Sequence, residues 1–137
     1  MSPATRLRAM LAEPRCHSFP CCFDALSAKL LAAAGHRISF MSGFAASATR
    51  IGEPDTGRIS SAEMVDCVRN ICAAAPELAL IADGDTGFGN AINTQRAVAS
   101  YAGAGAAAIM IEDQVNPKKC GHTRGKQVAP RDEARAR

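Results

Sequence analysis

The chain has 137 residues, of which 47% are hydrophobic and 21% charged, and its net charge at pH 7 is +3. These values are ordinary for a globular protein of about one domain. No basic run with interleaved aromatic residues supports nucleic-acid binding, and no apolar segment of about 18 residues predicts a transmembrane helix. The first residues lack the apolar core of a secretion signal. Six cysteines without a zinc-binding spacing fit a reduced, cytoplasmic protein.

Two helices and one strand are expected in the first part of the chain. Residues 4–13 predict a short helix, and residues 17–21 predict a first strand. Asp24 is expected to cap a second helix that reaches Ala34. Three leucines at helical spacing are expected to share its inward face: Leu26, Leu30 and Leu31.

The middle of the chain contains a strand, a loop and a helix. Residues 38–41 form a short apolar run that predicts a strand. Residues 43–59 hold four Gly or Pro residues and little periodicity, so we expect a long loop, which compact domains usually keep for function. Ser60 and Glu63 match a capping box and predict the start of a helix, which Pro76 ends.

The last part repeats the alternation of strand and helix. Residues 78–82 and 107–111 are apolar runs that predict two more strands. Asn93 is expected to cap the helix between them, and residues 130–134 have the pattern of a helical first turn. The residues expected to face inward from the capped helix, and the glycines expected to end it, are Ala97, Val98, Tyr101, Gly103 and Gly105.

Apolar strands that alternate with helices indicate an α/β fold with a parallel sheet covered by helices. Four such strands are half of a (β/α)8 TIM-type barrel, so residues 1–137 are predicted to form one partial, apparently truncated barrel domain. A half-barrel is expected to expose two sheet edges and an apolar layer. The alternative is a complete small flavodoxin-like sheet, which the missing fifth strand and the unfinished last helix disfavour.

Polar groups follow the strand ends, where parallel sheets bind their ligands. Asp83 and Asp85 are one residue apart, and Glu112 follows the next strand, so the three carboxylates predict an all-oxygen site. Mg²⁺ prefers such ligands, and Mn²⁺ accepts them too. The alternative is a solvated Asp-Gly-Asp turn. The nearby glycines do not match a phosphate-binding loop.

Cys120 lies within the segment 118–122, Lys-Lys-Cys-Gly-His. Nearby positive charge favours the thiolate, and such a thiol can exchange a proton with a carbanionic carbon. The alternative is a solvated loop with a chance cysteine.

Other polar residues have weaker signals. Ser42 and Gly43 could bind a substrate carboxylate or form a plain turn. Asp55 could be a buried acid or a turn former. His17 and His36 have no partner visible in the sequence and are interpreted as structural.

The segment 117–122 is similar to a signature of the isocitrate lyase/phosphoenolpyruvate mutase superfamily. That signature is a lysine, then a lysine or an arginine, then Cys-Gly-His. Further segments resemble the family in the same order: residues 23–28, 42–48, 54–57, 83–90 and 112–114. The resemblance extends over about residues 14–137. The cysteine is typical of the lyase branch, which includes isocitrate, 2-methylisocitrate and dimethylmalate lyases. The family fold is an (α/β)8 barrel, often in oligomers.

The resemblance implies a magnesium-dependent carbon–carbon lyase. It would cleave a small 2- or 3-hydroxy di- or tricarboxylate, methylisocitrate-like, into a 2-oxo acid and a carboxylate. The implied metal ligands are Asp83, Asp85 and Glu112. The implied catalytic residues are Cys120, which protonates the enolate product, with Lys118 and His122 in support. The implied substrate-binding residues are Ser42, Gly43, Asp55 and Gly121.

Two alternatives to this activity stay open. The family's barrel continues through four more strands, so the chain could be a catalytically incompetent fragment that pairs with a complementary half-barrel. It could also be a carboxyphosphonoenolpyruvate mutase or an oxaloacetate hydrolase type of enzyme. A homo-oligomer is expected if the chain is such a fragment, and the resemblance to the family implies one as well.

Overall fold

The computed structural model describes all residues, 1–137. Helices and strands alternate along the chain: α1 (Pro3–Leu11), β1 (Cys21–Cys22), α2 (Ala25–Ala33), β2 (Ile38–Met41), α3 (Gly43–Arg50), α4 (Ser61–Ala74), β3 (Ala79–Asp83), α5 (Ala91–Ala104), β4 (Ala108–Met110) and α6 (Arg131–Ala136). The strands form one four-stranded parallel sheet in the order β1-β2-β3-β4. The predicted α/β class is confirmed.

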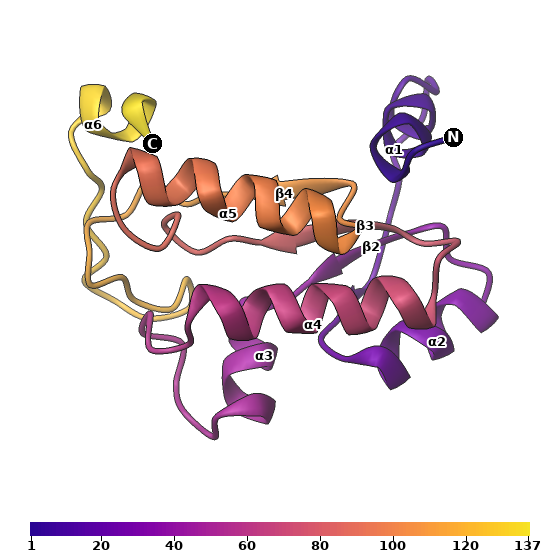
Figure 1. Cartoon of the computed structure of the whole chain (residues 1–137), viewed down its shortest axis with the longest axis horizontal. Coiled ribbons are helices and arrows are strands. Elements are labelled where there is room, and N and C mark those ends of the chain that lie inside the picture. Colours follow the sequence, from indigo (N-terminus) through magenta and orange to yellow (C-terminus); the bar gives the residue numbers. More distant parts are fainter.

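The main core lies between one face of the sheet and the helices α2, α4 and α5 (Figure 1). Met41 and Leu80 of the strands are fully buried against Met64 and Ile71 of α4. The opposite face carries a row of residues in register that are only half-buried: Phe40, Ile81 and Ala108. This less covered apolar face is what a partial barrel was expected to leave.

Helix α1 lies beside the amino ends of the strands, to the right in Figure 1. Its Leu7 packs with Ile38 and Ala79 in a second, small cluster. Arg6 Nη2 donates to the carbonyl of Pro76 at 2.7 Å. The loop after β4 lies at the other, carboxyl end of the sheet (Figure 1). No helix of the chain is both long and apolar enough to cross a membrane.

The expectation of a loop over residues 43–59 is wrong for its first half, because α3 occupies Gly43–Arg50. Ser42 caps this helix by accepting a hydrogen bond from the backbone N–H of Ala45 at 3.2 Å. The capping signal was masked by Gly43, a poor helix residue. Here Gly43 is needed, since an added Cβ would lie 2.5 Å from Asp83 Oδ2.

The first strand is shorter and later than residues 17–21, because regular pairing begins only at Cys21. Pro20 has no N–H to give to the sheet, although its carbonyl accepts from Phe40 N at 3.3 Å. Helix α2 starts at the predicted cap, Asp24. Of the three leucines predicted to face inward, Leu31 packs against the core as expected, whereas the other two do not. Leu26 and Leu30 are 66% and 62% exposed, because the small residue Ala28 packs inward against the core instead.

Helix α4 begins at the predicted capping box, with Ser60 and Glu63 bonded reciprocally. In α5 the predicted cap is wrong, because Asn90 Oδ1, and not Asn93, accepts the first N–H groups. Two of its predicted inward residues, Ala97 and Tyr101, are buried as expected, whereas Val98 is exposed. Gly105 ends the helix as expected, whereas Gly103 lies within it.

Candidate active site

Asp83 ends β3 and is held by backbone groups from two directions. Its Oδ2 accepts from Gly43 N at 3.1 Å, and its Oδ1 accepts from Asp85 N at 3.0 Å. The hydroxyl of Tyr101, from the buried face of α5, donates to the Asp83 carbonyl at 2.9 Å. The carboxylate is therefore fixed by backbone groups that follow β2 and β3, and α5 holds the backbone of Asp83 from behind.

The ends of β3 and β4 are joined through backbone hydrogen bonds. Gly84 N donates to the Met110 carbonyl at 2.8 Å, and Glu112 N donates to the Asp85 carbonyl at 2.7 Å. A side chain at Gly84 would lie 2.7 Å from Ile109 Cδ1, so only glycine permits this approach. Asp85 and Glu112 thus follow neighbouring strands, as the sequence predicts.

Lys118 lies between two carboxylates from different loops. Its Nζ is 2.7 Å from Asp55 Oδ1 and also forms an ion pair with Asp85 Oδ1. The three side chains are almost completely shielded from solvent, with 1% exposure for Lys118, 7% for Asp55 and 5% for Asp85. The Lys-Lys-Cys-Gly-His segment is therefore attached to the strand ends by its first lysine.

This arrangement shifts the pKa of two of its members. Burial raises the pKa of Asp85 to about 6, and the ion pair with Lys118 opposes that shift only in part. Burial would lower the pKa of Lys118, but its bonds to Asp55 and Asp85 outweigh burial and raise it. One ammonium shared by two carboxylates explains both directions, because Lys118 is stabilised by two acids whereas Asp85 is only partly compensated for its burial.

Glu112 is half-buried and is oriented by Gln114, whose Nε2 donates to Glu112 Oε2 at 2.7 Å. The same amide group also donates to the Lys119 carbonyl at 2.9 Å and accepts from Lys119 N at 3.2 Å. The loop is closed at its base, since Val115 N donates to the Gln127 carbonyl at 3.0 Å. Gln114 therefore links an expected metal ligand to the segment that carries the thiol.

The remaining predicted residues are only partly gathered at this site. Cys120 is buried, with 8% exposure, and lies in the loop that Lys118 anchors. Gly121 and His122 are exposed, and the His122 ring lies 6.3 Å from the Phe44 ring of α3. Ser42 Oγ and the N–H of Gly43 are already engaged, in the cap of α3 and with Asp83.

The carboxylates at the strand ends leave one buried oxygen without a hydrogen bond or ion pair, which bears on their fit to a divalent cation. No three His, Cys, Asp or Glu side chains form a ready-made metal cluster, so the ligand set of Asp83, Asp85 and Glu112 stays a prediction. Asp85 Oδ2 is nevertheless buried and has no hydrogen-bond partner. A buried carboxylate oxygen without a donor is costly unless a cation or water compensates it. The donor set thus fits a hard cation that the other acids reach through water.

Three features of this site were missed in the sequence. The pairing of Lys118 with two acids, the hydroxyl of Tyr101 and the amide of Gln114 all depend on contacts between distant or looped segments. Gln114 follows the Glu-Asp pair directly, so its position was a usable signal. Nothing local marks Tyr101 as more than a core residue.

Comparison with known proteins agrees with the predicted superfamily. The phosphoenolpyruvate phosphomutase family model matches residues 7–137. A chloroplastic carboxyvinyl-carboxyphosphonate phosphorylmutase of Arabidopsis thaliana is 47% identical over 97% of this chain and 39% of its own length. The 2,3-dimethylmalate lyase of Eubacterium barkeri is 41% identical over 97% of this chain and 46% of its own length. The chain therefore spans less than half of these relatives.

Solved structures give the same result. Oxaloacetate acetylhydrolase bound to 3,3-difluorooxalacetate superposes with a TM-score of 0.94 and 36% identity, over 98% of this chain and 46% of the other. Phosphonopyruvate hydrolase bound to oxalate and Mg²⁺ superposes with a TM-score of 0.86 and 34% identity, over 99% of this chain and 46% of the other. The four-stranded sheet thus corresponds to part of a barrel, as predicted. The chain belongs to the phosphoenolpyruvate mutase/isocitrate lyase family and matches its N-terminal region.

Proposed function

We propose that the chain forms the metal- and thiol-bearing part of a magnesium-dependent carbon–carbon lyase. The observation that carries this proposal is a charge imbalance at the strand ends. Three buried carboxylates, of Asp55, Asp83 and Asp85, have a single buried ammonium, of Lys118, among them. A divalent cation would balance the remaining formal charge of about −2, and hard oxygen ligands suit Mg²⁺, with Mn²⁺ as an alternative.

The substrate class is a small 2- or 3-hydroxy di- or tricarboxylate, methylisocitrate-like. Mg²⁺, when bound, supplies Lewis-acid stabilisation of negative charge on the substrate oxygens. Asp83, Asp85 and Glu112 would hold it, some of them through water. Ser42, Gly43, Asp55 and Gly121 would hold one end of the substrate, and the ion pair of Asp55 with Lys118 supports a position of Asp55 beside the metal.

Cys120 is proposed as the general acid. The substrate hydroxyl gives its proton to water, the Cα–Cβ bond breaks, and its electron pair leaves a 2-oxo acid and a carboxylate enolate. The thiol of Cys120 gives its proton to the enolate carbon. Lys118 and His122 would support this thiol and the negative charge of the enolate. The burial of Cys120 supports this role, because a shielded thiol delivers its proton without competition from water.

Two other activities remain as alternatives within the same site. The relatives include a carboxyvinyl-carboxyphosphonate phosphorylmutase and an oxaloacetate acetylhydrolase, so P–C mutase or oxaloacetate hydrolase chemistry is the second candidate. The third candidate is that the chain is a catalytically incompetent part of such an enzyme, because it spans less than half the length of its relatives. In that case the activity requires a complementary half-barrel or a homo-oligomer. We also propose that the protein is located in the cytoplasm.

The test is a product assay with the chain alone and with the chain extended by the second half of a relative. Each protein is incubated with Mg²⁺ and 2-methylisocitrate, isocitrate, dimethylmalate or oxaloacetate, and the 2-oxo acid or oxalate is measured. The lyase proposal expects 2-oxo acid from a hydroxy acid. If only the extended protein forms product, the chain by itself is a catalytically incompetent part of the enzyme. If oxalate is the only product, the activity is that of an oxaloacetate hydrolase.

The role of the thiol is tested separately. Cys120→Ser should lower turnover by about 10²- to 10⁴-fold, the usual contribution of a general acid, and leave Mg²⁺ binding unchanged. Cys16→Ser, at an exposed free cysteine, is the matched control and should retain full turnover. Unchanged turnover in Cys120→Ser excludes the thiol as the acid.

A further inference from the structure

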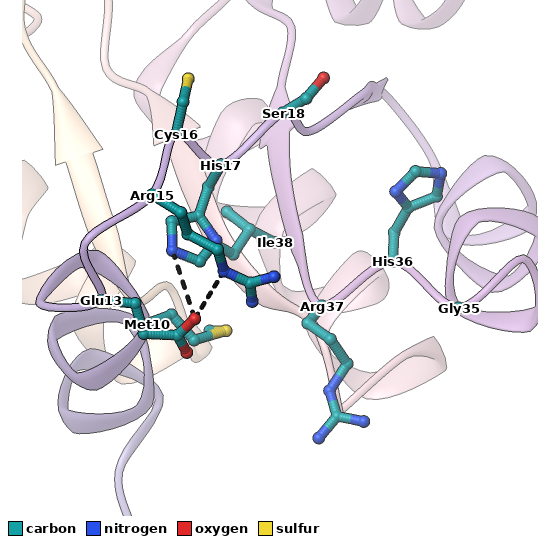
Figure 2. Close-up of a pocket in the computed structure, with 10 residues that line it drawn as sticks. All are labelled: Met10, Glu13, Arg15, Cys16, His17, Ser18, Gly35, His36, Arg37 and Ile38. Atoms are coloured by element: carbon teal, nitrogen blue, oxygen red, sulfur yellow. Dashed lines mark ion pairs between the residues drawn. The ribbon is translucent and has the colours of Figure 1, made fainter.

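A polar cavity lies at the amino ends of the strands, opposite the candidate active site. It has a volume of about 390 Å³, within the usual range for small-molecule sites. Three segments line it: the end of α1, the linker to β1 and the turn between α2 and β2 (Figure 2). The side chains that matter for its chemistry are Glu13, Arg15, His17, His36 and Arg37.

The fold fixes these segments in place. Gly35 has a φ of 89°, a left-handed conformation that glycine adopts readily and that reverses the chain after α2. The carbonyl of Arg37 then accepts a hydrogen bond from Ala79 N at 2.8 Å, so the backbone that presents Arg37 belongs to the sheet. Met10 and Ile38 add apolar surface to the lining.

The charges of the lining do not cancel. Glu13 Oε2 lies 2.6 Å from Arg15 Nε and 3.9 Å from His17 Nε2, and Figure 2 shows both side chains converging on it. Arg37, from the opposite segment, takes part in neither contact. Glu13 is the only acid among the lining residues, whereas two arginines line the cavity. The lining is therefore positive even when both histidines are neutral.

One buried polar atom of the lining is also without a hydrogen bond. His17 Nε2 is buried and has no hydrogen-bond partner. A buried ring nitrogen without a partner costs free energy unless a ligand or water completes it. The sequence interpretation of His17 as purely structural leaves this nitrogen unexplained.

We propose that this cavity binds a small oxyanion, of the phosphate or carboxylate type, between Arg37 and the pair of Arg15 and His17. Guanidinium groups bind such anions through paired N–H donors. Arg15 uses its Nε for Glu13, so its terminal nitrogens remain available to a ligand. The site is separate from the proposed lyase site, because it lies at the opposite end of β2 from Ser42.

The three histidines of the chain allow a direct test by NMR. His17 and His36 line the cavity, whereas His122 lies in the loop at the other end of the sheet. Ring signals of the metal-free full chain are followed during titration with inorganic phosphate, with malonate and with chloride of equal ionic strength. We expect saturable shifts of His17 and His36 and none of His122. The anion that binds more tightly identifies the phosphate or the carboxylate class.

Substitutions of two arginines test whether the anion binds in the cavity. Arg37→Gln should weaken binding by about 10-fold or more, the usual effect of losing a hydrogen bond between charged groups. Arg124→Gln, at an exposed arginine of the other loop, should bind as the unaltered chain does, and circular dichroism confirms the fold of both. Equal shifts with chloride, shifts of His122 alone, or undiminished binding by Arg37→Gln would overturn the proposal.

Discussion

The two ends of the sheet place charged side chains in opposite environments. At the carboxyl end, Lys118 pairs with Asp55 and Asp85, and all three are at most 7% exposed. At the amino end, Arg15 pairs with Glu13 beside an open cavity, and these side chains are 65% and 43% exposed. Exposed ion pairs contribute about 0–1 kcal/mol, whereas breaking a buried pair costs several. Burial should therefore decide which of the two ion pairs stabilises the fold.

The strongest challenge to this comparison is Lys118→Met, which leaves Asp55 and Asp85 buried without their shared ammonium. The expected loss in the free energy of unfolding is about 3–5 kcal/mol at pH 7, the cost of an uncompensated buried charge. Urea denaturation in the presence of a chelator measures it. The matched control is Lys119→Met, at the exposed neighbouring lysine, with an expected change within about 0.5 kcal/mol. A similar small change in Lys118→Met would show that the buried pair contributes little.

A second prediction concerns pH. Because burial raises the pKa of Asp85 to about 6, the folded chain holds this proton more tightly than the unfolded chain. The protonated carboxyl therefore contributes stability that is complete below pH ~4 and lost as the pH rises through about 6. The loss should be about 2–3 kcal/mol, since one pKa unit corresponds to about 1.4 kcal/mol.

Asp85→Asn should remove this loss, because the amide stays neutral throughout. Urea denaturation of metal-free protein at pH 4.5 and pH 7 compares the two proteins, and the free energy of unfolding of the variant should differ little between the two pH values. Asp113→Asn, at an exposed acid nearby, should keep the pH dependence of the unaltered chain. If Asp85→Asn also keeps it, the carboxyl of Asp85 is not the group that titrates.

The parts of the fold that were predictable depend on local signals. Ser60 was identified as a cap because its partner Glu63 lies three positions later, and Asp24 because an acid directly precedes an apolar helical pattern. Helix α3 was missed because the reason for its glycine is not local. Gly43 is required by the carboxylate of Asp83, a residue on the neighbouring strand.

The candidate site shows the same division. Parallel strands end at one edge of a sheet, so the sequence pattern was sufficient to place Asp83, Asp85 and Glu112 at the ends of neighbouring strands. The destination of Lys118 was not predictable, because it depends on how a loop folds back over the strand ends. The sequence interpretation assigned Lys118 to the thiol beside it, whereas its ammonium contacts two acids.

A third, smaller effect tests whether the carboxyl end is held by hydrogen bonds as well as by charge. Tyr101→Phe removes the donor to the Asp83 carbonyl and leaves the buried ring in place. The expected loss is about 1–2 kcal/mol, because the carbonyl loses its partner in a buried position. Thermal or urea unfolding measures it, and Mg²⁺ binding should weaken only slightly. A loss as large as that of Lys118→Met would place the main stabilisation in the hydrogen bond instead of the ion pair.

The smallest effect is expected at the amino end, from Glu13→Gln. The variant breaks the ion pair with Arg15 but keeps the shape and a polar group, and solvent can hydrate the freed guanidinium. We expect a change within about 0.5 kcal/mol in urea denaturation at pH 7. The same variant removes the only acid of the cavity lining and should therefore bind phosphate more tightly. A stability loss comparable to that of Lys118→Met would mean that burial does not distinguish the two ends. A small loss with tighter anion binding is what an exposed, ligand-accepting cluster requires.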